Sequence, residues 1–458
     1  MINYRTIARQ LTLFIRQYSP LSVEEMCPIT LSILCFRFAA YDRAQETYGE
    51  TDPWGWLIRK VGEEGLEPKY LLQDTLSEAG VLFKDKEMYN LYDRAMRAVG
   101  RLPEGDFCKE YLLLIDELTK DYCVDIRRAG IFNHILQIHG GRYMETVPAE
   151  VTSLVSMLIR RYVWDNPGAV LYEPACGVGS LGVRVFGRNA SRLAGLVMRE
   201  GSVLQADMAR LNLFVNGIVQ YDLKNEDLLR DDWMPTERFD VVVSMPAWGQ
   251  RRRIDPPLQG GLPLRYPQFT ELPYDYACIM RGLESLKMDG MMVMAMPMGV
   301  LIQMGIGEAV RREIILHKDL RAVIGMPVNM LYSTSVAFAL LVFQHSERRK
   351  GVLMVNAKDL YDGHGRLNRM NLSNQQRIAQ CFLGHRTVIG LSRVVEYDEI
   401  ANNGFNLLPS HYVKDPTAEQ RAITEKIKEI NELTARMKEI TLQHNEYLRQ
   451  LGLPELEL

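Results

Sequence analysis

Residues 170–182 read V-L-Y-E-P-A-C-G-V-G-S-L-G, and this short stretch decides the fold of the chain. An apolar strand runs into a loop in which Gly177, Gly179 and Gly182 follow the spacing G-x-G-x-x-G, and a helical stretch comes next. Glycines at these positions let the backbone turn sharply and let a ligand approach it, while the first turn of the helix offers free N–H groups. The pattern predicts a strand–loop–helix unit that binds a nucleotide-like cofactor.

Short apolar runs alternate with longer amphipathic stretches on both sides of this unit. The runs are A-V-L-Y (169–172), L-A-G-L-V-M (193–198), F-D-V-V-V-S (239–244), M-M-V-M-A-M (291–296), R-A-V-I-G-M (321–326) and V-A-F-A-L-L-V-F (336–343). Continuous apolar strands separated by helices indicate a mostly parallel sheet that is covered on both faces. We therefore expect an α/β, Rossmann-like fold, with V-L-M-V-N-A (352–357) as a candidate edge strand.

Two helical regions flank the sheet. Residues 1–140 lack strand-like alternation, and Ser22 followed by Glu25 is a capping box that predicts a helix start. Near the other end, apolar residues recur at steps of three and four through 415–451, which predicts a long helix with one apolar stripe. That stripe packs either on its own domain or against a partner as a coiled-coil arm. The expected units are a helical domain over 1–140, an α/β domain over 141–413 and a C-terminal helix over 414–458.

The composition is that of an ordinary globular protein. The chain has 458 residues, of which 47% are hydrophobic, and its formal net charge is −3. No overall positive field attracts nucleic acid, so contact with a polyanion must come from local patches or from a partner. The seven cysteines form no C-x-x-C pair, which fits reduced thiols in a cytoplasm and argues against a zinc site. Without a signal peptide or an unbroken apolar span, we expect a cytoplasmic location, no metal and no membrane contact.

Acidic residues near the glycines narrow the choice of cofactor. Glu200 lies near the end of the next strand, where a ribose hydroxyl needs an acceptor, so an NAD(P)-type oxidoreductase is one candidate. Glu173 and Pro174, however, interrupt the strand end, where a dinucleotide fold normally stays apolar. A carboxylate at this position suits a ligand with a cationic end and not a pyrophosphate. S-adenosylmethionine has an ammonium group, a ribose and no phosphate, so it is favoured, although a tight turn without a ligand stays open.

The segment E-P-A-C-G-V-G-S-L resembles the loop D-P-A-C-G-T-G-G-F of adenine-specific DNA methylases, in particular the methylation subunit of type I restriction–modification systems. Six further segments resemble the family and occur in the family's order, one before the loop and five after it. They are 141–155, 199–218, 225–229, 294–313, 322–343 and 402–413. The resemblance implies S-adenosylmethionine as the cofactor, with Glu200 on its ribose and Asp227 beside its adenine. The cofactor-binding residues that it implies are Thr146, Glu173, Pro174, Ala175, Cys176, Gly177, Gly179, Ser180, Glu200, Asp227 and Leu228.

The same resemblance draws attention to Met245, Pro246, Ala247 and Trp248, which occupy the positions of the family's catalytic Asn-Pro-Pro-Phe or Asn-Pro-Pro-Tyr. In that motif the extruded adenine stacks on the aromatic ring, and the Asn oxygen and a proline carbonyl accept its amine hydrogens. Trp248 keeps the stacking platform and Pro246 keeps its carbonyl. A Met245 thioether is a very weak acceptor, and Ala247 loosens the turn.

Ser244 carries a hydroxyl, but it comes one residue early and is expected on the opposite face unless the strand bulges. Three functions therefore stay open. One is an active adenine methylase with an unusual site. The second is an inactive subunit that keeps cofactor and DNA geometry and serves as a scaffold or DNA-binding partner of an active methylase paralogue. The third is another small-molecule methyltransferase or an oxidoreductase.

Contacts with DNA and with other subunits complete the expectations. Arg251, Arg252 and Arg253 follow the motif directly and suit phosphate contacts beside an extruded base, although a solvated charged loop is the alternative. The resemblance also implies a separate specificity subunit and, in a complete system, a restriction subunit. The helix at 414–458 is the candidate for the contact with the specificity subunit.

Overall fold

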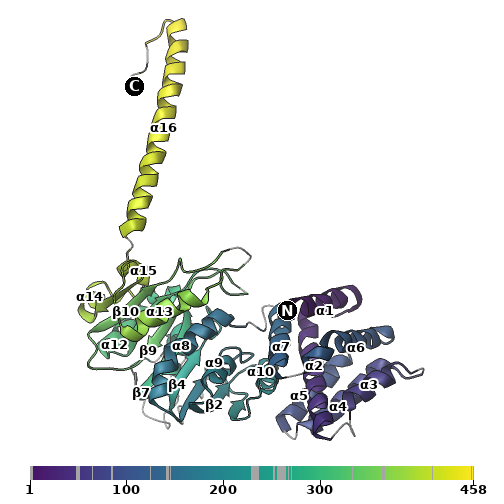
Figure 1. Ribbon diagram of the computed structural model, residues 1–458. Helices are drawn as coiled ribbons and strands as arrows, with labels where there is room; N and C mark the ends of the chain where they lie inside the picture. The colour runs from purple at the N-terminus through teal and green to yellow at the C-terminus, as the bar shows by residue number, and fades with distance from the viewer. Residues whose placement is uncertain are drawn as a thin grey trace.

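The computed structural model shows a helical region, an α/β body and one long helix that projects from the body (Figure 1). Placement is described for residues 4–47, 52–63, 65–83, 86–123, 125–140, 144, 146–227, 229, 237–250, 253–254, 265–266, 268–269, 271–332, 334–363, 367–414, 416–454 and 456. All structural statements below concern these residues.

The N-terminal region is helical, as its sequence predicts. Its elements are α1 (Tyr4–Tyr18), α2 (Val23–Glu46), α3 (Pro53–Val61), α4 (Pro68–Leu82), α5 (Lys86–Val99), α6 (Asp106–Thr119), the short 3-10 helix η1 (Lys120–Tyr122) and α7 (Asp125–His139). The predicted capping box begins α2. The Ser22 hydroxyl accepts the N–H of Glu25 at 3.2 Å, and the Glu25 carboxylate accepts the N–H of Ser22 at 3.0 Å. Two otherwise unpaired donors are satisfied at the point where the buried central helix starts.

The body contains a nine-stranded sheet in the order β11-β10-β8-β9-β7-β4-β1-β2-β3. Its strands are β1 (Ala169–Glu173), β2 (Leu193–Arg199), β3 (Tyr221–Lys224), β4 (Phe239–Ser244), β7 (Leu286–Pro297), β8 (Leu320–Gly325), β9 (Phe338–Phe343), β10 (Gly351–Asn356) and β11 (Ser392–Glu396). Only β9 and β11 pair with their neighbours in the antiparallel sense. The mostly parallel Rossmann-like sheet is thereby confirmed. The candidate edge strand at 352–357 corresponds to β10, but the edge itself is formed by β11.

Helices cover both faces of the sheet. Residues of α8 (Ala149–Asp165), α9 (Gly182–Asn189) and α13 (Leu372–Gly384) pack in the core on one face. The core on the other face holds residues of α11 (Tyr274–Glu284), α12 (Ile306–Leu316), α14 (Tyr397–Asn402) and α15 (Pro409–Tyr412). The 3-10 helix η2 (Met298–Leu301) follows β7, and β5 (Arg253–Ile254) pairs with β6 (Leu272–Pro273) in a separate small ribbon.

The helix α10 (Val203–Val215) joins the helical region to the body. Its residues Met208, Leu211 and Val215 belong to the hydrophobic core of the helical region, whereas Ala209 and Leu213 face the core under the sheet. One helix therefore contributes to two cores. The limits 1–140 and 141–413 that the sequence suggests stay a prediction.

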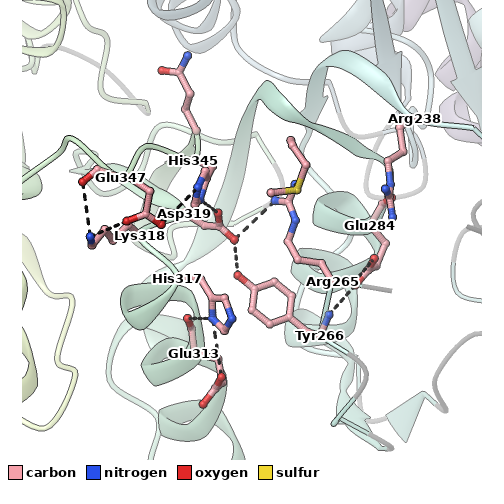
Figure 2. Close-up of polar contacts among 12 residues, drawn as sticks. Arg238, Arg265, Tyr266, Glu284, Glu313, His317, Lys318, Asp319, His345 and Glu347 are labelled. Atoms are coloured by element: carbon pink, nitrogen blue, oxygen red, sulfur yellow. Dashed lines mark hydrogen bonds and ion pairs between the residues drawn. The ribbon is translucent and has the colours of Figure 1, made fainter. Parts of the chain in front are cut away.

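A buried polar network lies at the amino-terminal edge of the sheet, where β7 and β8 begin (Figure 2). The Tyr266 hydroxyl donates to the carboxylate of Asp319, and His345 Nδ1 lies 2.9 Å from the other oxygen of that carboxylate. The Glu284 carboxylate accepts the backbone N–H groups of Arg265 and Tyr266 at 2.8 and 3.1 Å. Burial raises the pKa of Glu284. These bonds anchor residues 265–266 at the edge away from the carboxyl ends of the parallel strands.

The helix α16 (Pro416–Gln450) projects from the body in Figure 1. Large apolar side chains along it are 53 to 72% exposed, namely Ile427, Ile430, Leu433, Met437, Ile440, Tyr447 and Leu451. Of the two alternatives for the apolar stripe, packing on its own domain is therefore wrong. Within the described part of the chain, no helix is long and apolar enough to cross a membrane.

Candidate functional site

The candidate site lies at the carboxyl ends of β1, β2, β3 and β4. From β1 the chain adds β2 and β3 on one side, and then crosses to place β4 on the other side. The helices α9 and α11 that come after β1 and β4 consequently pack on opposite faces of the sheet. Ligands of open α/β sheets bind at such switch points.

The glycine loop (residues 174–181) makes the sharp turn that its sequence predicts. Gly177 and Gly179 have φ angles of +55° and +73°, a region that favours glycine. A Cβ atom on Gly179 would lie 3.1 to 3.3 Å from side-chain atoms of Met198, Val183 and Ala209. The N–H of Cys176 donates to the Arg199 carbonyl at 3.0 Å, so the loop is fixed to the end of β2. At Gly179 the loop therefore passes closer to β2 and α10 than a residue with a side chain usually does.

Glu173 lies at the end of β1, beneath the start of α9. One of its carboxylate oxygens accepts the N–H of Gly182 at 2.9 Å. A side chain at Gly182 would clash with this carboxylate, because the added Cβ would be 2.3 Å from the oxygen. Burial raises the pKa of Glu173 well above its ordinary value, and the bond from Gly182 only partly opposes this effect.

Glu200 and Asp227 occupy the ends of the next two strands. Glu200 accepts the N–H of Gly177 with one oxygen and the N–H of Ser202 with the other, both at 2.8 Å. Burial raises the pKa of Glu200, and the nearby Asp227 carboxylate adds to the rise. Asp227 in turn accepts the N–H of Leu229 at 2.8 Å.

Three carboxylates thus line adjacent strand ends, at Glu173, Glu200 and Asp227. Among the described residues, no lysine, arginine or histidine forms an ion pair with any of them. Glu173 is buried, and Glu200 and Asp227 are half-buried. Negative charge that is withdrawn from water without a cation is costly, so these strand ends fit a ligand that carries positive charge. The three acceptors suit the ammonium, sulfonium and ribose hydroxyls of S-adenosylmethionine.

The segment at Thr146 borders the glycine loop. The Ser180 hydroxyl accepts the N–H of Val147 at 2.8 Å, which links the segment to the loop. The Thr146 hydroxyl is buried and has no hydrogen-bond partner in the described part of the chain. A buried polar group of this kind carries a desolvation cost that a ligand can remove. Pro174 is buried and Ala175 half-buried in the same loop. The predicted contact Leu228 lies outside the described residues.

The site turn (residues 245–249) follows β4 without a bulge at its end, because Ser244 pairs with Met294 in the regular register of β4 and β7. The strand therefore directs Ser244 and Met245 to opposite faces. The Ser244 hydroxyl is buried without a partner in the described part of the chain, while Met245 packs half-buried against the core on the α8 side. Pro246 is buried and Ala247 exposed.

Trp248 is held in place from two sides. Its indole Nε1–H donates to the Ala295 carbonyl on β7 at 3.0 Å, and its ring lies 5.7 Å from the ring of Phe338 on β9. The next residue, Gly249, has a φ of +67° and donates its N–H to the Asp275 carboxylate at 3.0 Å. Burial raises the pKa of Asp275, which the bond from Gly249 partly offsets.

Sequence reasoning did not single out two residues that fix this region. Asp275 holds the end of the site turn, and Asn212 donates from its side-chain amide to the Val178 carbonyl in the glycine loop at 3.0 Å. An acidic residue in the first turn of a predicted helix signals only a favourable interaction with the helix dipole. Nothing in the sequence indicates that Asp275 meets a residue 26 positions earlier.

The arginines that follow the site turn are only partly described. Arg251 and Arg252 lie outside the described residues. The backbone of Arg253 belongs to β5 and pairs with Pro273, directly before α11, while its side chain is not described. Phosphate contact by these residues stays a prediction.

Residues 137–421, more than half of the chain, match the family described as N-6 DNA methylase. The chain belongs to the N-6 DNA methylase family. Among its curated relatives, the type I restriction enzyme MjaVIII methylase subunit of Methanocaldococcus jannaschii is 25% identical over 330 residues, which cover 66% of the chain and 54% of the relative. The MpnII methylase subunit of Mycoplasma pneumoniae is 22% identical over 322 residues, covering 65% and 59%.

The fold has a close counterpart among solved structures. The type I restriction-modification system methyltransferase subunit from Streptococcus thermophilus superposes with a TM-score of 0.71 at 18% identity, over 90% of this chain and 99% of that one. At this identity the likeness establishes the fold alone. The chain spans between 53 and 59% of the length of the curated relatives that it matches.

Proposed function

We propose that this chain is a methylation subunit similar to those of type I restriction–modification systems, which binds S-adenosylmethionine and DNA and methylates adenine at N6. The observation that carries the proposal is the glycine loop, pinned to β2 between Glu173 and Glu200 at the switch point of the sheet. Family membership over 137–421 supports the same reaction.

Each carboxylate has a distinct part in holding the cofactor, which supplies the methyl group when it is bound. Glu200 accepts hydrogen bonds from the ribose hydroxyls, as the acidic residue at the end of the second strand usually does in such folds. Asp227 accepts a hydrogen bond from the adenine. Glu173 lies below the loop, and the positive charge of a bound cofactor favours its ionised form. The unpaired Thr146 hydroxyl provides a further polar contact. Pro174, Ala175, Cys176 and Ser180 shape the loop around the cofactor.

The target adenine stacks on Trp248, which is ready for this role because Ala295 and Phe338 fix its indole before any base arrives. A fixed platform loses little entropy on binding. The Pro246 carbonyl accepts one hydrogen of the amine. Charge that develops on the amine nitrogen has no second acceptor at Met245, and removing one such contact typically costs about 3 kcal/mol, or roughly a hundredfold in rate.

The geometry at Met245 also favours a second candidate function. Its thioether packs half-buried against the core and Ser244 is on the opposite face of the strand, so neither provides the acceptor that the family motif has. In this second candidate the chain binds cofactor and DNA without transferring a methyl group, and acts as a scaffold beside an active methylase paralogue. Trp248 and the glycine loop keep the same roles in both candidates.

The partners in either case are DNA and other subunits. The exposed apolar stripe of α16 suits a helix of a specificity subunit, because side chains at steps of three and four pack between helices. The curated relatives are named as methylase subunits of type I restriction enzymes, which supports a multi-subunit assembly that includes a restriction subunit. Arg251, Arg252 and Arg253 are the proposed phosphate contacts.

Calorimetric titration with S-adenosylmethionine, followed by a methyl-transfer assay on DNA with the specificity subunit present, tests the proposal. Binding together with transfer supports the active methylase. Binding without transfer supports the second candidate, and transfer that appears only in Met245→Asn assigns the defect to that side chain. Absence of cofactor binding, or tight binding of a nicotinamide dinucleotide instead, would overturn the proposal.

A further inference from the structure

An ion pair links the helical region to the back of the glycine loop. Arg94 on α5 donates from Nε and from one terminal nitrogen to the two carboxylate oxygens of Asp207 on α10, at 2.7 and 2.6 Å. The Asp207 side chain is 5% exposed and that of Arg94 40%. A bidentate pair with one buried partner is among the stronger and more directional ion pairs in proteins.

α10, which carries Asp207, forms the wall behind the loop. Asn212 of this helix holds the Val178 carbonyl at 3.0 Å, and the Cβ of Ala209 lies 3.3 Å from the position that a Cβ of Gly179 would take. The Val178 side chain belongs to the core of the helical region, together with α10 residues such as Met208. A displacement of α10 therefore moves the backbone of the glycine loop.

We propose that Arg94 is a positioning residue for the cofactor site: by fixing Asp207, it holds α10 and the glycine loop in the arrangement that binds S-adenosylmethionine. This inference rests on the proposed function, because it states how the helical region controls the cofactor affinity of the same site. Arg94 itself touches neither the glycine loop nor the site turn through any hydrogen bond in the described part of the chain. It acts through α10.

Other charges near the pair limit the size of the effect. Arg210 lies 3.6 Å from Asp207 and 3.7 Å from Glu87, so Asp207 keeps one cation when Arg94 is replaced. Loss of Arg94 consequently removes the directional constraint from α5 without leaving a buried charge alone. Substitutions of this kind, remote from a ligand, change its affinity by about two- to thirtyfold, and we expect about fivefold here.

The chain offers a matched control. Arg101 pairs with Glu25 at 2.7 Å on the rim of the same groove, a space of about 550 Å3 between α2, α5 and α10 that Arg94 and Asp207 also line. This second pair has no hydrogen bond to α10. Arg101→Gln therefore removes an equal charge from the same groove without releasing the helix.

The test compares the full-length wild type with Arg94→Gln, Arg94→Lys, Arg101→Gln and the exchanged pair Arg94→Asp with Asp207→Arg. Calorimetry with S-adenosylmethionine, well below the unfolding temperature, should give about fivefold weaker binding for Arg94→Gln. Arg94→Lys keeps the charge but cannot form the bidentate pair, so its affinity for S-adenosylmethionine should lie between those of Arg94→Gln and wild type. Arg101→Gln should match wild type, and the exchanged pair should recover part of the loss.

Hydrogen exchange at the Gly179 amide provides a second readout, which needs no cofactor. This amide donates to the Cys176 carbonyl at 2.8 Å, so a loosened loop should exchange faster in Arg94→Gln than in Arg101→Gln. Equal affinity and equal exchange in Arg94→Gln and wild type would refute the positioning role, as would equal losses in the two glutamine variants. If wild type fails to bind S-adenosylmethionine, the proposed function fails by itself, and exchange at Gly179 still decides whether Arg94 controls the loop.

Discussion

Replacing Gly179 by alanine should destabilise the protein by about 2 to 5 kcal/mol. Two costs add at this position. Its φ of +73° is unfavourable for any residue with a Cβ, at about 1 to 2 kcal/mol. The new methyl group would also lie 3.1 to 3.3 Å from Met198, Val183 and Ala209, and overpacking of a tight core costs about 1 to 3 kcal/mol.

Gly177 allows the two costs to be separated. Its φ of +55° carries the same backbone penalty, but the nearest atom to an added Cβ is the Gln205 side-chain oxygen at 3.5 Å, which is ordinary contact. Gly177→Ala should therefore lose only about 1 to 2 kcal/mol. Urea unfolding followed by circular dichroism measures both free energies. Equal losses in the two variants would show that the loop does not press against β2 and α10 as described.

Three further predictions concern Glu200, Trp248 in the site turn and the exposed stripe of α16. Burial raises the pKa of Glu200, so the folded protein binds the proton of this carboxyl more tightly than the unfolded chain does. As the pH falls from 7 towards the ordinary pKa of 4.5, the free energy of unfolding of wild type should therefore rise relative to that of Glu200→Gln. Urea titrations measure both free energies, and the same pH dependence in both proteins would count against the burial of Glu200. Trp248→Phe removes the hydrogen bond to the Ala295 carbonyl and should weaken DNA binding by about 1 kcal/mol. DNA with 2-aminopurine at the target position reports this binding by fluorescence, and an unchanged signal and affinity would argue against a fixed stacking platform. Ile440→Asp in the exposed stripe of α16 should abolish co-purification with the specificity subunit and leave the unfolding temperature unchanged. The exposed charge change Glu439→Gln should alter neither co-purification nor the unfolding temperature.

The sequence predicts the parts of the fold that depend on local patterns. Apolar runs mark six strands correctly, and the glycine spacing marks the loop, because both signals lie within a few neighbouring residues. β3 and β11 have no such signal, since Y-D-L-K and S-R-V-V-E carry polar residues and lie at the edges of the sheet. Edge strands need less apolar surface than central ones.

Contacts between distant segments are beyond the reach of such patterns. Asp275 meets Gly249 because of the path that the chain takes after β4. Residues 265–266 are bound at the opposite edge of the sheet, where β7 begins, and the chain then returns to start α11 beside the site turn. The packing of Val178 into the core of the helical region likewise depends on how α10 sits between two cores. Side-chain identity at Met245 could be compared with a family motif, but the half-buried position of its thioether could not be derived from the sequence.

The length of α16 sets a spatial scale for whatever assembly the chain forms. Thirty-five residues at 1.5 Å per residue give a rod of about 50 Å. That span equals roughly 15 base pairs of duplex DNA at 3.4 Å each. A protein bound at the tip of this rod would sit more than one turn of the double helix from the point where the rod leaves the body. If the proposed stacking of a base on Trp248 holds, the place where DNA is read and the place where it is modified would be kept apart by a rigid spacer.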